Sequence, residues 1–373
     1  MSKILIIGGG VIGTMHAWQA LERGHQVVQL ERDLTPRSAS VRNFGLVWVS
    51  GRASGAELDE ALRARELWGK LAQDNASLNF RANGSLTIAR SEAELTVMQE
   101  STQKADAESR GWRLLDAAET RVLNPALRGK FLGALWCPLD AAVEPPTVLG
   151  EMRGYLAANP NYEVSFGVEV VDFAETDSSV AAIARNGQRF EADLVILCPG
   201  ADHSTLFGEK FATAPLRRVR LQMMSTAPFD EEITTSIADG DSLRYYPAYD
   251  VPALKKLAPQ HPIAAEHAMQ LLLVQRTDGT LTIGDTHEYD EPFEFRLRED
   301  VYQYLTDVAS DILGRRIPEI VNRWDGIYSQ RTDGAICDRK QISPRIISVT
   351  GPGGRGNSLS PAIAETTFKT LID

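Results

Sequence analysis

Cysteine is scarce in this sequence. Cys137, Cys198 and Cys337 are the only three among 373 residues, and no two of them form a C-x-x-C pair. This number and spacing exclude a disulfide-dense secreted scaffold and a zinc site built from cysteine pairs. We therefore predict small buried thiols in a reducing cytoplasm, and no metal site.

An excess of positive charge and long apolar runs are also lacking. The formal net charge is −11, so long-range attraction to nucleic acid or to an anionic membrane is excluded as a basis for function. No apolar run approaches the ~20 residues that span a bilayer. The first glycine motif begins at Gly8, so we expect no signal peptide ahead of it. An anionic substrate would then depend on individual arginines.

A glycine-rich turn stands near the N-terminus. "KILIIGGG" is typical of a strand buried on both faces, and it leads into Gly8-x-Gly10-x-x-Gly13. "TMHAWQALERG" then has helical spacing, and "HQVVQLER" predicts the next strand. In such a unit the glycines permit a tight turn, close approach of a pyrophosphate and close helix packing. The helix N-terminus supplies N–H groups to the phosphates.

Glu31 closes the second predicted strand, eighteen residues after Gly13. An acidic side chain there accepts hydrogen bonds from the ribose hydroxyls of an adenosine and repels a 2′-phosphate. The pattern therefore predicts a dinucleotide site and disfavours NADP. NAD and FAD remain equally compatible with it.

A second glycine-rich turn, "GPGGRGNSLSPAIAE", runs from Gly351 to Glu365 after the predicted strand "RIISVTG". NAD has no further negative group that would need a second helix N-terminus. The isoalloxazine of FAD does, because its pyrimidine edge gains negative charge on reduction. The alternative is an ordinary strand-to-helix turn without a ligand.

These motifs, with "SASVRNFG", "FGVEVVDF", "ADLVILCPGA", "DGTLTIGDTHEYD" and "WDGIYSQRTDG", carry a resemblance over the whole chain. Their order and spacing resemble the D-amino-acid oxidase family of FAD enzymes, in its glycine oxidase and sarcosine oxidase branch. "SASVRNFG" is also similar to a bacterial subgroup that breaks down aminophosphonates. The resemblance implies FAD as cofactor, and a small amine as substrate.

The fold implied is of the α/β class. We predict a Rossmann-like FAD-binding domain with a parallel sheet, made of residues 1–85, 145–215 and 325–373. A substrate domain with an antiparallel sheet, residues 86–144 and 216–324, would be inserted in pieces.

The resemblance also assigns the cofactor site. Ser40, Arg42, Asn43 and Gly45 would line the pyrophosphate and the reactive flavin edge, and Val170 would meet the adenine. The predicted cofactor-binding residues are Gly8, Gly10, Val11, Ile12, Gly13, Glu31, Arg32, Ser40, Arg42, Asn43, Gly45, Val170, Gly200, Ala201, Gly353, Gly354, Arg355, Gly356, Asn357 and Ser358. Ile327 replaces the cysteine that links flavin in sarcosine oxidases, so the FAD is predicted to be non-covalent. Thr282 replaces a lysine that assists reaction with oxygen, which leaves oxidase and dehydrogenase open.

The sequence departs from the family at the carboxylate anchors. Tyr328 stands where glycine and D-amino-acid oxidases carry arginine, and Ser358 stands where sarcosine oxidases carry lysine. The arginine of sarcosine oxidases that follows the flavin-edge loop maps near Trp48. Replacement cations could be Arg52, Arg244, Arg331 or Arg355, of which Arg331 and Arg355 lie in motifs expected to face the flavin. The predicted substrate-binding residues are Arg331, Arg355, Tyr328, His287, Arg244, Tyr246 and Trp48.

Together these features predict an FAD-dependent oxidoreductase that oxidises the C–N bond of a small primary or secondary amine. An amino acid, an N-methyl amino acid or an aminophosphonate would fit, and no side chain is assigned as catalytic base. Two alternatives remain. A 2-hydroxy-acid dehydrogenase of the same fold would use His287 as general base. A non-catalytic dinucleotide-binding module would show no substrate-driven bleaching of its chromophore.

Overall fold

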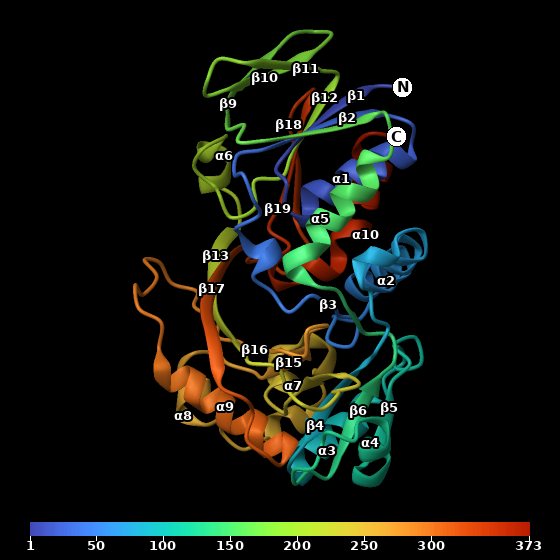
Figure 1. Cartoon of the computed structure of the whole chain (residues 1–373), viewed down its shortest axis with the longest axis vertical. Helices are drawn as coiled ribbons and strands as arrows, with labels where there is room; N and C mark the ends of the chain where they lie inside the picture. The colour runs from blue at the N-terminus through green and yellow to red at the C-terminus, as the bar shows by residue number, and fades with distance from the viewer.

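A computed structural model describes all 373 residues, and two large sheets occupy separate halves of it (Figure 1). The first sheet has the strand order β18-β19-β12-β1-β2-β8. Its strands are β1 (Lys3–Ile7), β2 (Gln26–Glu31), β8 (Tyr162–Phe166), β12 (Leu194–Leu197), β18 (Asp338–Ser343) and β19 (Ile346–Thr350). Neighbouring strands run parallel, except that β18 is antiparallel to β19.

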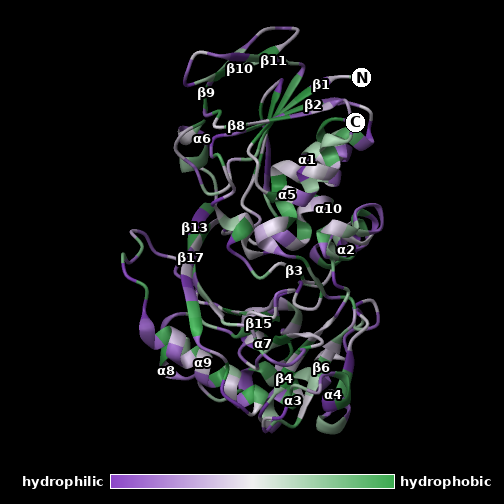
Figure 2. Cartoon of the chain, viewed as in Figure 1, coloured by the Kyte–Doolittle hydropathy of each residue, from purple (hydrophilic) through white to green (hydrophobic).

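Helices cover one face of this sheet and a small sheet covers the other. The helices are α1 (Val11–Glu22), α5 (Pro145–Ala157) and α10 (Gly356–Leu371), and the small sheet is β9 (Val170–Glu175), β10 (Val180–Ala184) and β11 (Arg189–Ala192). In β1, Ile4 and Ile6 pack in the helical core, whereas Leu5 and Ile7 pack against the small sheet. The strand is therefore apolar on both faces, and Figure 2 colours the centre of this sheet as hydrophobic.

The second large sheet has the order β17-β13-β16-β15-β14-β4-β6-β5. Its strands are β4 (Ser85–Ala89), β5 (Arg113–Asp116), β6 (Gly133–Cys137), β13 (Leu216–Thr226), β14 (Ser236–Ala238), β15 (Leu272–Gln275), β16 (Leu281–Gly284) and β17 (Ile320–Arg331). All pairs are antiparallel except β14 with β4. The amphipathic helix α9 (Glu299–Leu313) packs its apolar side into the core beneath this sheet. The long strands β13 and β17 reach from this sheet toward the parallel one (Figure 1).

The remaining elements are short, apart from α2. They are α2 (Ala56–Asp74), α3 (Glu92–Ser101), α4 (Ala117–Leu123), α6 (Gly208–Ala212), α7 (Ser242–Tyr245), α8 (Pro262–Glu266), the strand pair β3 (Leu46–Val47) and β7 (Ala141–Ala142), and the 3-10 turns η1 (Ala39–Val41), η2 (Ala76–Leu78), η3 (Pro247–Tyr249), η4 (Pro252–Lys256) and η5 (Gly353–Arg355). None of the helices has both the length and the apolar character needed to cross a bilayer.

The predicted fold class is confirmed: a parallel sheet flanked by helices, with a separate, mostly antiparallel sheet. β1, α1 and β2 form the predicted strand–helix–strand unit. The strands of the second sheet come from residues 85–137, 216–284 and 320–331, so it is assembled from separate pieces of the chain. The exact domain boundaries stay a prediction.

Candidate active site

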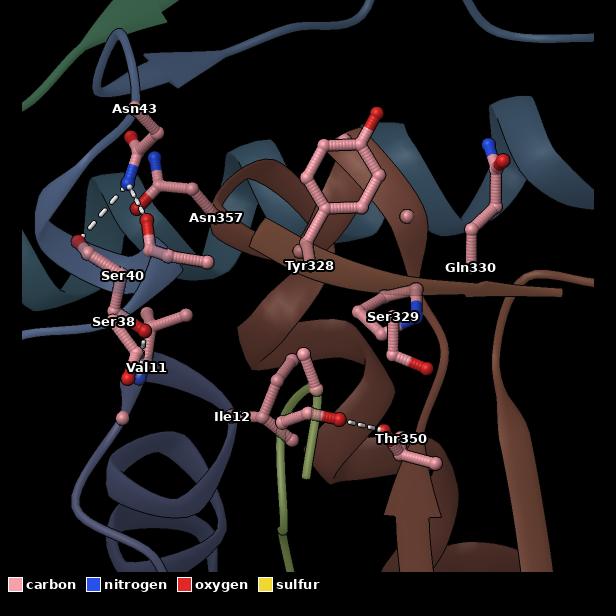
Figure 3. A pocket seen from close by; sticks show the side chains of 18 of the residues that line it. Val11, Ile12, Ser38, Ser40, Asn43, Tyr328, Ser329, Gln330, Thr350 and Asn357 are labelled. Atoms are coloured by element: carbon pink, nitrogen blue, oxygen red, sulfur yellow. Dashed lines mark hydrogen bonds between the residues drawn. The ribbon is translucent and has the colours of Figure 1, made fainter. Parts of the chain in front are cut away.

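One large cavity of about 610 Å³ extends from the N-terminus of α1 to the strands β13, β15 and β17 of the second sheet. This volume lies within the range of about 300–1,000 Å³ that is usual for cofactor and small-molecule sites. All the predicted cofactor and substrate residues line it, with the exception of Gly45. Figure 3 shows Val11 and Ile12 on α1 across the cavity from Tyr328 on β17.

Gly8 and Gly10 of the first motif are glycine for different local reasons. A β-carbon on Gly8 would stand 2.4 Å from the carbonyl oxygen of Cys198, and Gly8 has a φ of +115°. A β-carbon on Gly10, however, would have only the Ser40 hydroxyl as a neighbour, at 3.1 Å. Packing of the chain therefore requires glycine at position 8. At position 10 the added carbon would project into the cavity, where a ligand passes.

Backbone N–H groups of the first turn of α1 lie at the same end of the cavity as Gly10. The Val11 N–H donates to Ser40 Oγ at 3.0 Å, while the N–H groups of Ile12 and Gly13 have no acceptor in the chain. First-turn amides of a helix are left over by the helical hydrogen-bond pattern and are suited to an anion. Glu31 is fixed at the end of β2 because Gly9 N–H and Asp33 N–H donate to its carboxylate, at 2.6 and 2.8 Å. Its position on the cavity wall fits a ribose.

The segment from Ser40 to Gly45, which is predicted to line the flavin edge, is held in place by hydrogen bonds of its side chains. Asn43 Nδ2 donates to the carbonyls of Ala39 and Ser40, at 2.9 and 3.0 Å (Figure 3). Arg42 Nη1 donates to the Asp325 carbonyl of β17 at 2.8 Å. Gly45 is not among the lining residues, and a β-carbon there would stand 2.1 Å from the Val143 carbonyl oxygen. Packing of the chain therefore requires glycine at position 45, and its contact with the cofactor stays a prediction.

The rest of the nucleotide wall comes from distant segments. Val170, Gly200 and Ala201 line it, and Thr350 Oγ1 donates to the Gly200 carbonyl at 2.6 Å. Arg32 also lines it, but forms an ion pair with Asp202 at 2.5 Å.

The second glycine motif forms η5 and the start of α10. Asn357 Nδ2 and Ser358 Oγ both donate to the Leu46 carbonyl, at 3.0 and 2.9 Å, and Ser358 Oγ accepts from Trp48 N–H at 2.9 Å. These side chains attach the turn to the β3 segment. Gly354 lies next to Tyr328, whose hydroxyl would be 3.6 Å from an added β-carbon.

Beyond Tyr328 the cavity becomes aromatic. Tyr245, Tyr246, Tyr289 and Tyr328 line it together with Trp48. The ring centroids of Tyr245 and Tyr246 are 5.0 Å apart in an edge-to-face pair, and those of Trp48 and Tyr246 are 5.7 Å apart. The Tyr328 hydroxyl has no hydrogen-bond partner, and burial raises its pKa well above the usual value. We call these five residues the aromatic chamber.

His287 and Asp285 close one side of the chamber. His287 stacks on Tyr245 with centroids 4.4 Å apart, and its Nδ1 lies 3.0 Å from the Ala268 carbonyl oxygen. A carbonyl only accepts, so Nδ1 carries hydrogen and Nε2 faces Asp285 Oδ2 at 3.8 Å. Asp285 is 4% exposed, its Oδ1 has no partner, and burial raises the pKa of its carboxyl. Sequence reasoning missed Asp285, although it lies in the motif "GDTHEYD".

The arginines expected to bind an anion differ in what already holds them. Arg331 donates to Asp333, with Nε at 2.8 Å from Oδ1, and also to Asp338. Two carboxylates thus neutralise its guanidinium, and the structure does not support Arg331 as the substrate anchor. Arg244 pairs with Asp241 at 3.3 Å and donates to the Ala258 carbonyl.

Arg52 and Arg355 share one acid. Glu57 lies 3.1 Å from Arg355 Nη1 and 3.7 Å from Arg52 Nη1. Arg52 is 5% exposed, and its Nε donates to the Trp48 carbonyl at 2.9 Å. Two guanidinium groups and one carboxylate leave a net charge of +1 on the wall beside the aromatic chamber. We call these three residues the arginine cluster.

Comparison with known sequences decides between the dinucleotides. The family model described as DAO, FAD dependent oxidoreductase, matches residues 3–369. The chain belongs to this family. It is therefore an enzyme that uses FAD, and the free amides of α1, the open space at Gly10 and the fixed Glu31 fit that cofactor.

Individual relatives are distant. The chain is 29% identical over 146 residues to one of the polypeptides of the opine oxidase of Rhizobium meliloti, a match that covers 36% of this chain and 39% of the relative. It is 20% identical over 251 residues to a D-amino acid dehydrogenase of Helicobacter pylori, covering 54% and 60%. The chain thus spans about half the length of these curated relatives.

Solved structures share the fold over nearly the whole chain. Glycine oxidase from Geobacillus kaustophilus superposes with a TM-score of 0.77 at 20% identity, covering 98% of this chain and 93% of that one. L-proline dehydrogenase from P. horikoshii gives a TM-score of 0.79 at 16% identity, covering 100% and 93%.

Proposed function

We propose that this member of the family oxidises the C–N bond of a small amine that also carries an anionic group. The observation that carries the proposal is the single cavity that joins the dinucleotide end to the aromatic chamber. The chamber is bordered by Asp285, whose carboxyl has one oxygen without a partner, and by the positively charged arginine cluster. A zwitterionic amine complements both groups.

Bound FAD would accept a hydride from the carbon next to the nitrogen, which leaves a C=N bond that water hydrolyses to a carbonyl compound and the released amine. The chain would orient the substrate so that this C–H bond faces the cofactor. Trp48, Tyr245 and Tyr246 would exclude bulk water around the reacting carbon. Arg52 and Arg355 would fix the anionic end.

We further propose that the anionic group is a phosphonate. Tyr328 and Ser358 occupy the positions of the family's carboxylate anchors, and their side chains carry no charge. Arg52 and Arg355 share one carboxylate and also donate to backbone carbonyls, Arg52 Nε to Trp48 at 2.9 Å and Arg355 Nη2 to Ala335 at 2.8 Å. A ligand would use the N–H groups that these contacts leave. A phosphonate offers three oxygens and a larger negative charge than a carboxylate, so it uses more of these donors.

The test is reduction of the bound flavin under anaerobic conditions, followed by its absorbance. The panel should contain glycine, N-methylglycine, D-alanine, 2-aminoethylphosphonate, its N-methyl derivative and lactate. We expect an aminophosphonate to reduce the flavin faster than the matching amino carboxylates. Faster reduction by glycine or N-methylglycine would overturn the phosphonate proposal alone. Reduction by lactate and by no amine would replace the proposal by C–O oxidation with His287 as base.

We also propose a cytoplasmic location. The three cysteines are free thiols in the folded chain, which suits a reducing compartment.

A further inference from the structure

We propose that Asp285 binds the substrate's ammonium group and accepts its proton before the C–H bond breaks. The proposal rests on the proposed amine oxidation, and it assigns a catalytic base to a site for which the sequence suggested none. It is carried by the position of Asp285 on the cavity wall and by its unpartnered Oδ1.

Two other deeply buried acids, Asp140 and Asp239, are satisfied by the chain itself. Asp140 accepts hydrogen bonds from Val49 N–H, from Ser50 N–H and Oγ–H, and from Ser85 Oγ–H, at 2.5 to 3.1 Å. Asp239 accepts from Leu271 N–H at 3.1 Å. Asp285 Oδ1 has no such partner, although Asp285 is as deeply buried, and the side-chain amide of Gln270 is the polar group that lies beside this carboxyl. Satisfied acids stabilise a fold, whereas an unsatisfied one is an expensive feature that requires another reason.

No lysine or arginine forms an ion pair with Asp285. Its one charged or chargeable neighbour within ion-pair distance is His287, whose Nε2 is 3.8 Å from Oδ2. The remaining titratable groups that face the carboxyl are phenols: Tyr245 and Tyr246 on and after α7, Tyr289 after β16, and Tyr328 on β17. A buried carboxylate in these surroundings lacks a positive partner. A substrate ammonium supplies one.

The surrounding rings favour the same ligand. Aromatic faces attract a cation within about 6 Å of the ring centroid, most strongly when water is excluded. Tyr328 is buried and Tyr245 and Tyr246 are half-buried around Asp285, and their phenols keep their protons because desolvation raises the pKa of each. They therefore add no competing negative charge.

The proton transfer balances without another reactant. An N–H bond of the ammonium breaks, an O–H bond forms on Asp285 Oδ1, and the electron pair of the broken bond stays on nitrogen. This lone pair assists departure of the hydride from the neighbouring carbon. Burial raises the pKa of the Asp285 carboxyl, which moves it toward that of the amine and makes the transfer easier. His287 lies beside Asp285 on the Oδ2 side, with its Nε2 at 3.8 Å.

The decisive variant is Asp285→Asn, which keeps the shape and removes the charge. Asp239→Asn is the matched control, since Asp239 is an equally buried acid that does not line the cavity. FAD content and thermal stability of both variants establish that they fold. Rates of anaerobic flavin reduction by 2-aminoethylphosphonate and by N-methylglycine are then measured from pH 6 to pH 10.

In the wild type we expect the reduction rate to fall as the pH drops through the raised pKa of Asp285. In Asp285→Asn we expect a rate at least about 100-fold lower at pH 7, because only the amine already neutral in solution can react. That rate should rise about tenfold per pH unit toward the pKa of the free amine, near 10. Asp239→Asn should keep the wild-type profile. An unchanged profile in Asp285→Asn would overturn the inference.

Binding gives a second readout that does not depend on turnover. Propylphosphonate has the anion of 2-aminoethylphosphonate without its ammonium. Calorimetry should show that Asp285→Asn weakens the binding of 2-aminoethylphosphonate by about tenfold or more and leaves propylphosphonate unchanged. If the wild type is not reduced by any amine, the proposed function fails, and these affinities still test Asp285. If the wild type binds 2-aminoethylphosphonate no more tightly than propylphosphonate, the inference about Asp285 fails.

Discussion

Gly13 lies so close to Gly8 that a β-carbon on Gly13 would stand 2.1 Å from the Gly8 carbonyl oxygen. The turn that opens the dinucleotide site is therefore fixed by the chain's own packing at this contact. Gly10, between the two, has no such contact, and its φ of −73° suits any residue. The two positions should respond differently to the same substitution.

We expect Gly10→Ala to fold normally and to lose FAD, because the added methyl group occupies the path of the pyrophosphate. Gly13→Ala should instead lower the yield of folded protein, since backbone atoms would have to move. Circular dichroism and the ratio of flavin to protein absorbance measure the two effects. Wild-type flavin content in Gly10→Ala would mean that the pyrophosphate lies elsewhere.

The arginine cluster leads to a second prediction. Arg355→Met and Arg52→Met should each raise the apparent KM for the anionic substrate by about tenfold or more, since a charged hydrogen bond contributes about 1.5–3 kcal/mol. Arg331→Met is the control, because Asp333 and Asp338 already hold its guanidinium. Its KM should stay within about twofold of the wild type. Steady-state kinetics with the best substrate of the panel check this, and a larger effect at Arg331 than at Arg355 would contradict the cluster.

Local pattern was sufficient to predict the dinucleotide half of the molecule. Strand, glycine turn, helix and acidic strand end lie within residues 3–31, so the pattern that identifies them is local, although β1 and β2 also pair with the distant strands β12 and β8. The same holds for the turn that leads into α10. Gly45 shows the limit even there, because its requirement comes from Val143 on a distant segment.

The substrate half could be predicted only in part. Asp285 is a site residue because the fold brings Tyr245, Tyr246 and Tyr328 around it. These residues come from separate segments, so their spacing in the sequence does not predict that they lie together. Glu57 was missed for the same reason, since it joins Arg52 to Arg355, and Glu57 and Arg355 are 298 positions apart in the sequence. The neutralisation of Arg331 could in part have been predicted from the sequence, because Asp333 follows it by two positions and Asp338 by seven positions. An arginine with nearby acids on its own loop is a poor choice for an anion anchor.

A third prediction concerns how FAD is held. Ile327 lines the cavity where sarcosine oxidases place their linking cysteine, and Cys198 is the one cysteine on the cavity wall, beside Gly8 at the nucleotide end. Acid precipitation of the purified protein should therefore leave all of the yellow colour in the supernatant. Cys198→Ala should give the same result. Colour retained in the wild-type pellet would show a covalent link.

A last prediction concerns the ion pairs between α2 and α10. Arg63 donates twice to Glu365, at 3.0 and 2.6 Å, and Lys369 lies 2.9 Å from the same carboxylate. These partners lower the pKa of Glu365 from 4.5 to about 2 in the folded protein. A carboxyl whose pKa is lower in the folded state stabilises the fold above its unfolded pKa, and this contribution disappears as the pH falls through the folded pKa.

Glu365→Gln should therefore lower the free energy of unfolding by about 1–2 kcal/mol at pH 7, a value reduced by the solvent exposure of Arg63 and Lys369. The difference from the wild type should shrink between pH 4.5 and about 2, the interval over which Glu365 itself becomes protonated first in the unfolded and then in the folded chain. Glu66→Gln is the control, because Glu66 also contacts Arg63, at 2.7 Å, but its side chain is 70% exposed. Its effect in urea unfolding should stay within about 0.5 kcal/mol. A loss in Glu365→Gln that is the same at pH 7 and pH 3 would show that packing of the side chain, and not its charge, joins the two helices.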